Sequence, residues 1–216
     1  MTKVIFKFDK EKDLYNIWET CNFNSEWADF KRGINPKIMK ICEGKEFEKC
    51  KNDLEEYYKR LHSSKIISII TKSVNKSWKE INDKFFKRLK KIMKKPICSE
   101  KFTGYLTTMG RCPYNIKENS FMFCFFNGIP HILKTVGHEI MHIQFHNTYW
   151  DNIEKQIGKE KTADLKESLT VLLNLEFKDL WIAEDKGYET HKELRKFIAE
   201  EWKKEKNFNV LLKKCI

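Results

Sequence analysis

The sequence has little arginine and no long apolar run, and each shortage argues against a class of protein. Only five of its 42 basic residues are arginine, although the formal net charge is +11. Arginine is the side chain that grips phosphate and reads bases bidentately, so nucleic-acid binding is an open but weaker interpretation of the charge. No stretch approaches the roughly 18 apolar residues of a membrane span, and the first residues lack a signal-peptide core. We therefore expect a cytoplasmic protein without a membrane partner.

Paired cysteines, internal repeats and low-complexity segments are also missing. The seven cysteines, an odd number without a Cys-x-x-Cys pair, indicate reduced thiols rather than a disulfide framework. We expect Cys42, Cys112 and Cys124 to be ordinary core or surface thiols and not metal ligands. The chain of 216 residues is 41% hydrophobic and 13% aromatic, which predicts a single folded domain over residues 1–216.

Apolar periodicity predicts an α+β fold. A short strand, "KVIFKF", opens the chain, and residues 45–95 carry apolar residues at helical spacing, so residues 1–100 form a mostly helical region. From residue 101 the segments "KFTGYLTTMG" and "SFMFCFFN" have strand composition, which predicts a small antiparallel or mixed sheet. Helices are expected around residues 130–146 and from Thr162 to Phe177.

The stretch "TVGHEIMHIQFH" places two histidines and a glutamate on the first of these helices. His138 and His142 are four residues apart and face the same side of a helix, with Glu139 beside them. In this arrangement zinc polarises a carbonyl and lowers the pKa of a water, while the glutamate accepts the proton of that water. The motif thus predicts amide-bond hydrolysis. A structural helix with surface histidines is the competing interpretation.

A catalytic zinc site needs a third protein ligand, and several residues compete for this role. His146 lies on the same face, but a straight helix carries it about 6 Å beyond His142. Glu167 is the better candidate, because it opens the next helix on the side away from its leucine stripe. A glutamate in a first helical turn is also stabilised by the helix dipole without any metal. Asp164 and Glu176 are the remaining candidates.

On these residues the sequence resembles the gluzincins, the thermolysin-like zinc peptidases with HExxH on one helix and a ligand glutamate on a following one. The resemblance covers about residues 101–177. It implies a zincin-like fold over residues 101–216, with His138, His142 and Glu167 as zinc ligands and Glu139 as general base. A weaker likeness links the chain to the ImmA/IrrE metallopeptidases, which cut repressor proteins.

One position departs from the gluzincin pattern. In that family an aspartate four residues after the ligand glutamate orients the first histidine, and here Val171 stands in its place. Asn174 or Thr170 is expected to substitute for it.

The sequence also offers candidates for the remaining catalytic groups and for the substrate. Tyr188 and His191, ahead of the last long helix, are the preferred donors to the oxyanion of the transition state. A peptide or protein is the expected substrate. The alternatives are a zinc hydrolase of a non-peptide amide and a non-catalytic basic protein, binding nucleic acid or protein, with structural histidines. The strand within "FTGYLTTMG" is either an edge to which a peptide adds or a buried strand.

Overall fold

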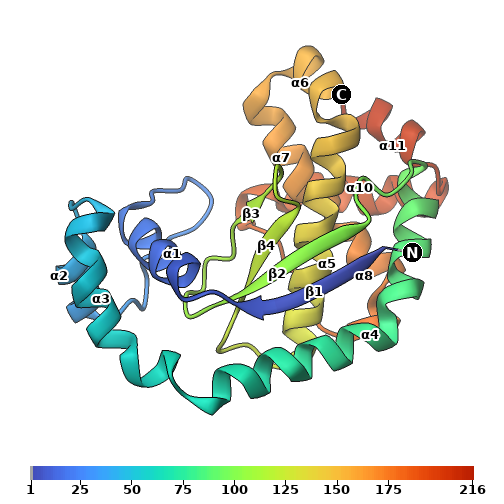
Figure 1. Cartoon of the computed structure of the whole chain (residues 1–216). Helices are drawn as coiled ribbons and strands as arrows, with labels where there is room; N and C mark the ends of the chain where they lie inside the picture. The colour runs from blue at the N-terminus through green and yellow to red at the C-terminus, as the bar shows by residue number, and fades with distance from the viewer. Residues whose placement is uncertain (1) are drawn as a thin grey trace.

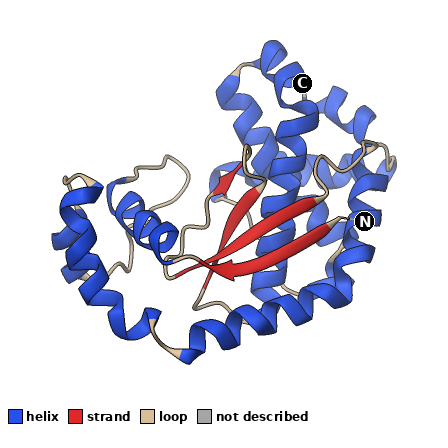
Figure 2. Ribbon diagram, viewed as in Figure 1, coloured by secondary structure: helices blue, strands red, loops and turns tan. Residues whose placement is uncertain are grey.

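The fold is a four-stranded mixed sheet with helices on one of its faces and around its ends, described for residues 2–216 by a computed structural model (Figures 1 and 2). The strands are β1 (Lys3–Phe8), β2 (Lys101–Thr107), β3 (Tyr114–Asn115) and β4 (Ser120–Cys124). The helices are α1 (Lys10–Asn22), α2 (Pro36–Cys42), α3 (Phe47–His62), α4 (Lys65–Met93), α5 (Ile129–Phe145), α6 (Asp151–Ile157), α7 (Lys159–Leu169), α8 (Val171–Glu176), α9 (Lys178–Trp181), α10 (Lys192–Lys204) and α11 (Phe208–Cys215). A π-helical turn, η1 (His146–Trp150), follows α5, and a 3₁₀ turn, η2 (Glu189–His191), precedes α10. The α+β class is as expected.

The sheet has the order β1-β2-β4-β3, in which β1, β2 and β4 are parallel and β3 is antiparallel to β4. The expected mixed sheet is therefore present, whereas an antiparallel sheet is wrong, because the neighbours β2 and β4 run in the same direction. Residues 108–119 explain the difference, since they contain β3 and return the chain to the end of the sheet where β2 began. The strand within "FTGYLTTMG" is the interior strand β2 and not an edge.

Helix α4 spans 29 residues and connects the α1–α3 region with the rest of the chain (Figure 1). It begins where the Ser64 hydroxyl accepts a hydrogen bond from the Ile66 backbone N–H over 3.2 Å, a typical N-cap. It ends at Met93 and is followed by Lys94, whose φ of 54° is left-handed. The buried Trp78 and Phe86 pack against Phe6 of β1 and Phe102 of β2. Helix α4 thus covers one face of the sheet.

The core has a large and a small part. The large cluster joins α4, α5, the sheet and the C-terminal helices, and the small one lies between α1, α2 and α3 around Leu14, Ile17 and Leu54. Strand β1 pairs with β2 over six residues, Lys3 to Phe8. The mostly helical first hundred residues and the following region therefore share one sheet.

The helix expected over Thr162–Phe177 is two helices, α7 and α8, which meet at Thr170. The Thr170 hydroxyl lies 2.7 Å from the Glu167 carbonyl oxygen and accepts a hydrogen bond from Arg195 Nη1 over 2.6 Å. Such a side chain competes with the helical backbone bonds and favours a break. Because α7 runs from Lys159 to Leu169, Glu167 lies in its last turn, and the expectation that Glu167 opens the helix is wrong.

Candidate metal centre

Helix α5 presents His138 and His142 on one face. The two imidazole centroids are 4.2 Å apart, with the rings at 76°. The opposite face carries Val136, Ile140 and Ile143, which are fully buried in the large core. Core packing fixes the rotation of α5 and thereby directs both imidazoles toward α7.

Gly137, directly before His138, allows α5 to approach α9 closely. A Cβ atom at this position would lie 2.6 Å from Trp181 Cη2 and 3.2 Å from Phe85 Cε2. Those distances are shorter than ordinary van der Waals contacts, so only glycine fits without a shift of the ring. Packing behind the histidines, and not chain flexibility, accounts for this glycine.

Glu167 brings a carboxylate from α7 to the two imidazoles. Its Oε2 lies 3.2 Å from His142 Nε2 and 3.6 Å from His138 Nε2. One ligand atom from each of the three residues lies within 4.8 Å of the others, a grouping that could hold a metal ion. The fold thus brings together the three residues expected as metal ligands.

The explanation of Glu167 by the helix dipole does not apply. The last turn of a helix carries partial negative charge, which disfavours a carboxylate there. The Glu167 side chain is nevertheless only 8% exposed, so it requires positively charged neighbours. The other candidate carboxylates are engaged elsewhere: Asp164 Oδ1 lies 2.9 Å from His191 Nε2, and Glu176 Oε1 lies 2.6 Å from Lys206 Nζ.

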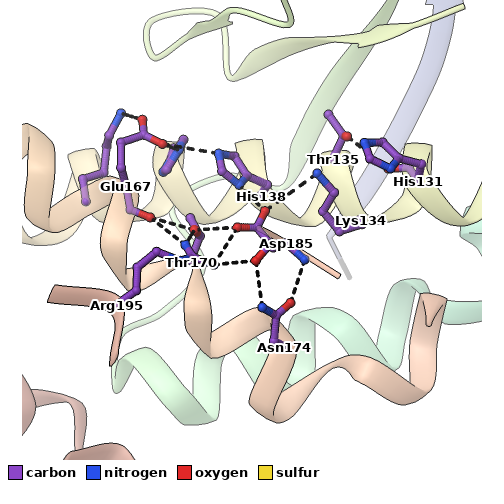
Figure 3. Close-up of polar contacts among 11 residues, drawn as sticks. His131, Lys134, Thr135, His138, Glu167, Thr170, Asn174, Asp185 and Arg195 are labelled. Carbon is purple, nitrogen blue, oxygen red and sulfur yellow. Dashed lines mark hydrogen bonds and ion pairs between the residues drawn. The ribbon is translucent and has the colours of Figure 1, made fainter. Parts of the chain in front are cut away.

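Asp185 orients His138, a role that the sequence pattern did not reveal (Figure 3). Its Oδ2 lies 2.7 Å from His138 Nδ1, and its side chain is 2% exposed. Arg195 Nη2 donates to Asp185 Oδ1 over 3.1 Å, and the Thr170 hydroxyl lies 3.0 Å from the same oxygen. The Asn174 amide bonds both the backbone N–H and the backbone carbonyl of Asp185 at 2.8 Å. The expectation that Asn174 or Thr170 orients His138 is therefore wrong: both of them hold Asp185 instead.

The two imidazoles have opposite electrostatic surroundings. Burial lowers the pKa of His142 to about 3, so its ring is neutral and can act as a ligand at neutral pH. Burial would also lower the pKa of His138, but the Asp185 carboxylate opposes it and raises that pKa to about 10. Despite burial, the imidazoles of His142 and His138 hold the pKa of Glu167 well below its usual value. The carboxylates around His138 therefore favour a positive charge at this point, which a proton or a bound cation would supply.

Glu139 is buried on the same helix, with 7% of its surface exposed. Burial raises the pKa of its carboxyl group to about 7, against the opposing effects of His138, Lys166 and Lys134. A carboxylate of this pKa exchanges a proton readily near neutral pH. The chemistry expected of Glu139 is thus compatible with its surroundings.

His146 lies outside the group of three. Helix α5 ends at Phe145, and His146 begins the π-helical turn η1. Its Nε2 lies 2.8 Å from the Tyr114 hydroxyl of β3, and its ring stacks on Trp150 at 4.1 Å. Neither Tyr114 nor its place beside the histidines was foreseen, since the "RCPYN" segment indicates only a turn.

The expected oxyanion donors Tyr188 and His191 lie next to each other, with ring centroids 5.7 Å apart. Trp27, from the segment between α1 and α2, packs against both rings at 5.7 and 5.3 Å. The His191 Nε2 atom is occupied by Asp164, and its Nδ1 atom is buried without a partner among residues 2–216. Burial raises the pKa of the Tyr188 hydroxyl, and the carboxylates of Glu167 and other nearby groups raise it further.

Comparison with family models, curated proteins and solved structures found no match to this chain. Over residues 2–216, no helix is long and apolar enough to cross a membrane. The functional argument therefore rests on the geometry and chemistry of the site.

Proposed function

We propose that this chain is a zinc-dependent metallopeptidase with a zincin-like catalytic region. The convergence of His138, His142 and Glu167 is the observation that carries the proposal. Two imidazole nitrogens and one carboxylate oxygen form a donor set of catalytic zinc sites, which keep a further position open. The likeness of the motif to that of the gluzincins supports the same ligands.

Each residue of the proposed site has a separate role in catalysis. A zinc ion bound by the three ligands would supply polarisation of the scissile carbonyl and acidification of a water molecule. Glu139 accepts the proton of that water and returns it to the leaving amine, a task suited to its pKa of about 7. Asp185 fixes the orientation of His138. Of the two predicted oxyanion donors, Tyr188 is preferred, because His191 Nε2 already pairs with Asp164 and His191 Nδ1 is buried.

An extended peptide is the substrate that the sheet edge favours. Asn115 pairs with Ser120, and the Pro113 carbonyl accepts a hydrogen bond from the Met122 N–H over 2.9 Å, so both face β4. Strand alternation then directs the N–H and C=O of Tyr114 away from the sheet. The Tyr114 ring lies 5.5 Å from that of His142. A peptide that pairs with this edge would run beside the ligands, whereas a small non-peptide amide would gain nothing from it.

The thiols support a cytoplasmic site of action. All seven cysteines are free, and four of them are buried. Free thiols persist in the reducing cytosol.

Zinc content and peptide hydrolysis, measured side by side, test the proposal. The wild type should bind one zinc per chain and cleave an unfolded protein, with both properties lost on chelation. Glu167→Ala should lose zinc, and Glu139→Gln should keep zinc but lose hydrolysis. A folded wild type that retains no zinc after loading and removal of excess metal would refute the proposal. Salt-sensitive nucleic-acid binding by that zinc-free protein would favour the basic binding protein. Cleavage of small amides but not of peptides would favour the other hydrolase.

A further inference from the structure

A buried lysine touches the carboxylate that faces the histidines. The Lys166 side chain is only 6% exposed, and its Nζ lies 2.7 Å from Glu167 Oε1. Lysine is rarely buried to this extent, because its ammonium group must be paired to offset the loss of hydration. The contact uses one carboxylate oxygen, while the other, Oε2, faces the imidazoles of His138 and His142.

Two further side chains hold the lysine in place. Lys166 Nζ donates to the Tyr114 hydroxyl over 3.0 Å, and that hydroxyl lies 2.8 Å from His146 Nε2. His146 in turn stacks on Trp150, with the ring planes at 22°. The chain of contacts therefore links α7, β3 and the turn after α5. His146 therefore belongs to the site through its contact with Tyr114, although it is not one of the three proposed metal ligands.

We propose that Lys166 is a positioning residue that restricts Glu167 to binding metal through one oxygen, with Tyr114 and His146 fixing the lysine. The inference rests on the proposed function, because it concerns the same metal ligands. A carboxylate can bind a cation through one oxygen or through both. Binding through both would occupy a position that a hydrolytic site keeps open for water and substrate. The ammonium group of Lys166 holds Oε1 away and preserves that position.

The alternative is that Lys166 merely balances the charge of buried Glu167. In that case its loss would change stability but not the coordination of the metal. The number of ligands around cobalt(II) is visible in its absorption spectrum, since four-coordinate sites absorb more strongly than sites with more ligands. Cobalt(II) is therefore the probe that separates the two roles.

The experiment compares wild type, Lys166→Met and Lys161→Met, each loaded with cobalt(II). Lys161 lies on the same helix but is exposed, so its variant controls for the loss of one charge. We expect each protein to bind one cobalt ion, and the visible absorption of Lys166→Met alone to fall several-fold. Tyr114→Phe, which removes a single hydroxyl, should shift the spectrum in the same direction by less and serves if Lys166→Met does not fold. Wild-type spectra in both of these variants would overturn the inference and leave the proposed function standing. A wild type that binds neither cobalt nor zinc would overturn both.

Discussion

Asp185 lies 2.7 Å from His138 Nδ1, although 47 residues separate the two in the sequence. The contact places a carboxylate behind an imidazole that we propose as a metal ligand. Such a carboxylate fixes the ring and strengthens the opposite nitrogen as a ligand. Arg195 donates a hydrogen bond to Asp185. Gly187 leaves space for the Arg195 side chain, because a Cβ atom at Gly187 would lie 2.6 Å from Arg195 Nε. The segment between α9 and α10 is thus part of the site.

Replacement of Asp185 by asparagine should weaken zinc binding about 10- to 100-fold, the usual effect of losing the partner of a ligand histidine. The affinity would be measured by competition with a chromophoric chelator, on protein shown to be folded by circular dichroism. Asp179→Asn is the matched control, since that carboxylate pairs with Arg88 and is 61% exposed. Equal affinities of the two variants would contradict the role assigned to Asp185.

Gly137→Ala should destabilise the protein by about 1–2 kcal/mol through overpacking against Trp181. Helix propensity alone would favour alanine by about 1 kcal/mol, so a net loss of stability reports the clash. Urea unfolding gives the free energy. Gly110→Ala is the control, because a Cβ at Gly110 would have no neighbour within 4 Å. Gly137→Ala should cost less stability in a Trp181→Leu background than in the wild type, because the smaller side chain relieves the clash. A stabilised single variant would disprove the close packing.

The parts of the site that sequence analysis predicted are those governed by local spacing. His138 and His142 lie on one face because a helix repeats every 3.6 residues, and this holds in any tertiary context. Glu167 was found from its place on the following helix. The break at Thr170 was not predicted, and it places Glu167 in the last turn of α7 and not in the first turn of a helix over Thr162–Phe177.

The unpredicted parts depend on which segments the fold brings together. Asp185 lies in a loop without periodicity, and Lys166 is concealed among the many lysines that solvate helix faces in this chain. Strand composition located β2 and β4, but their parallel direction is set by the path of residues 108–119. Spacing rules carry no information about such long-range contacts.

Glu176 should stabilise the protein at neutral pH and lose this effect in acid. Burial would raise its pKa, but hydrogen bonds from Lys206 and Trp202 outweigh burial and lower that pKa below the usual 4.5. A lowered pKa in the folded state means that stabilisation is present above about pH 4.5 and disappears as the pH falls through the folded-state pKa. The unfolding free energies of wild type and Glu176→Gln should differ by about 0.5–1 kcal/mol at pH 7 and converge once the pH falls below the folded-state pKa of Glu176. Glu200→Gln, at an exposed position of α10, is the control, and its unfolding free energy should stay close to that of the wild type at both pH values.

Asp13 should be far more important to stability than Asp9, although both lie near the start of α1. The fully buried Asp13 carboxylate accepts hydrogen bonds from the Thr108 N–H at 2.7 Å and the Thr107 hydroxyl at 2.8 Å, and lies 2.8 Å from His62 Nε2. These contacts join α1 to the end of β2 and to the end of α3. Loss of one partner from such a buried network costs about 3–5 kcal/mol.

The matched comparison is Asp9→Ala, which removes only the N-cap of α1 and should cost about 1 kcal/mol. Urea unfolding should therefore rank Asp13→Ala well below Asp9→Ala. Zinc affinity should stay at the wild-type value in both folded variants, because the proposed ligands lie on α5 and α7. Equal losses of stability would show that the α1–α3 region is held by its own small core, independently of the contact between Asp13 and β2.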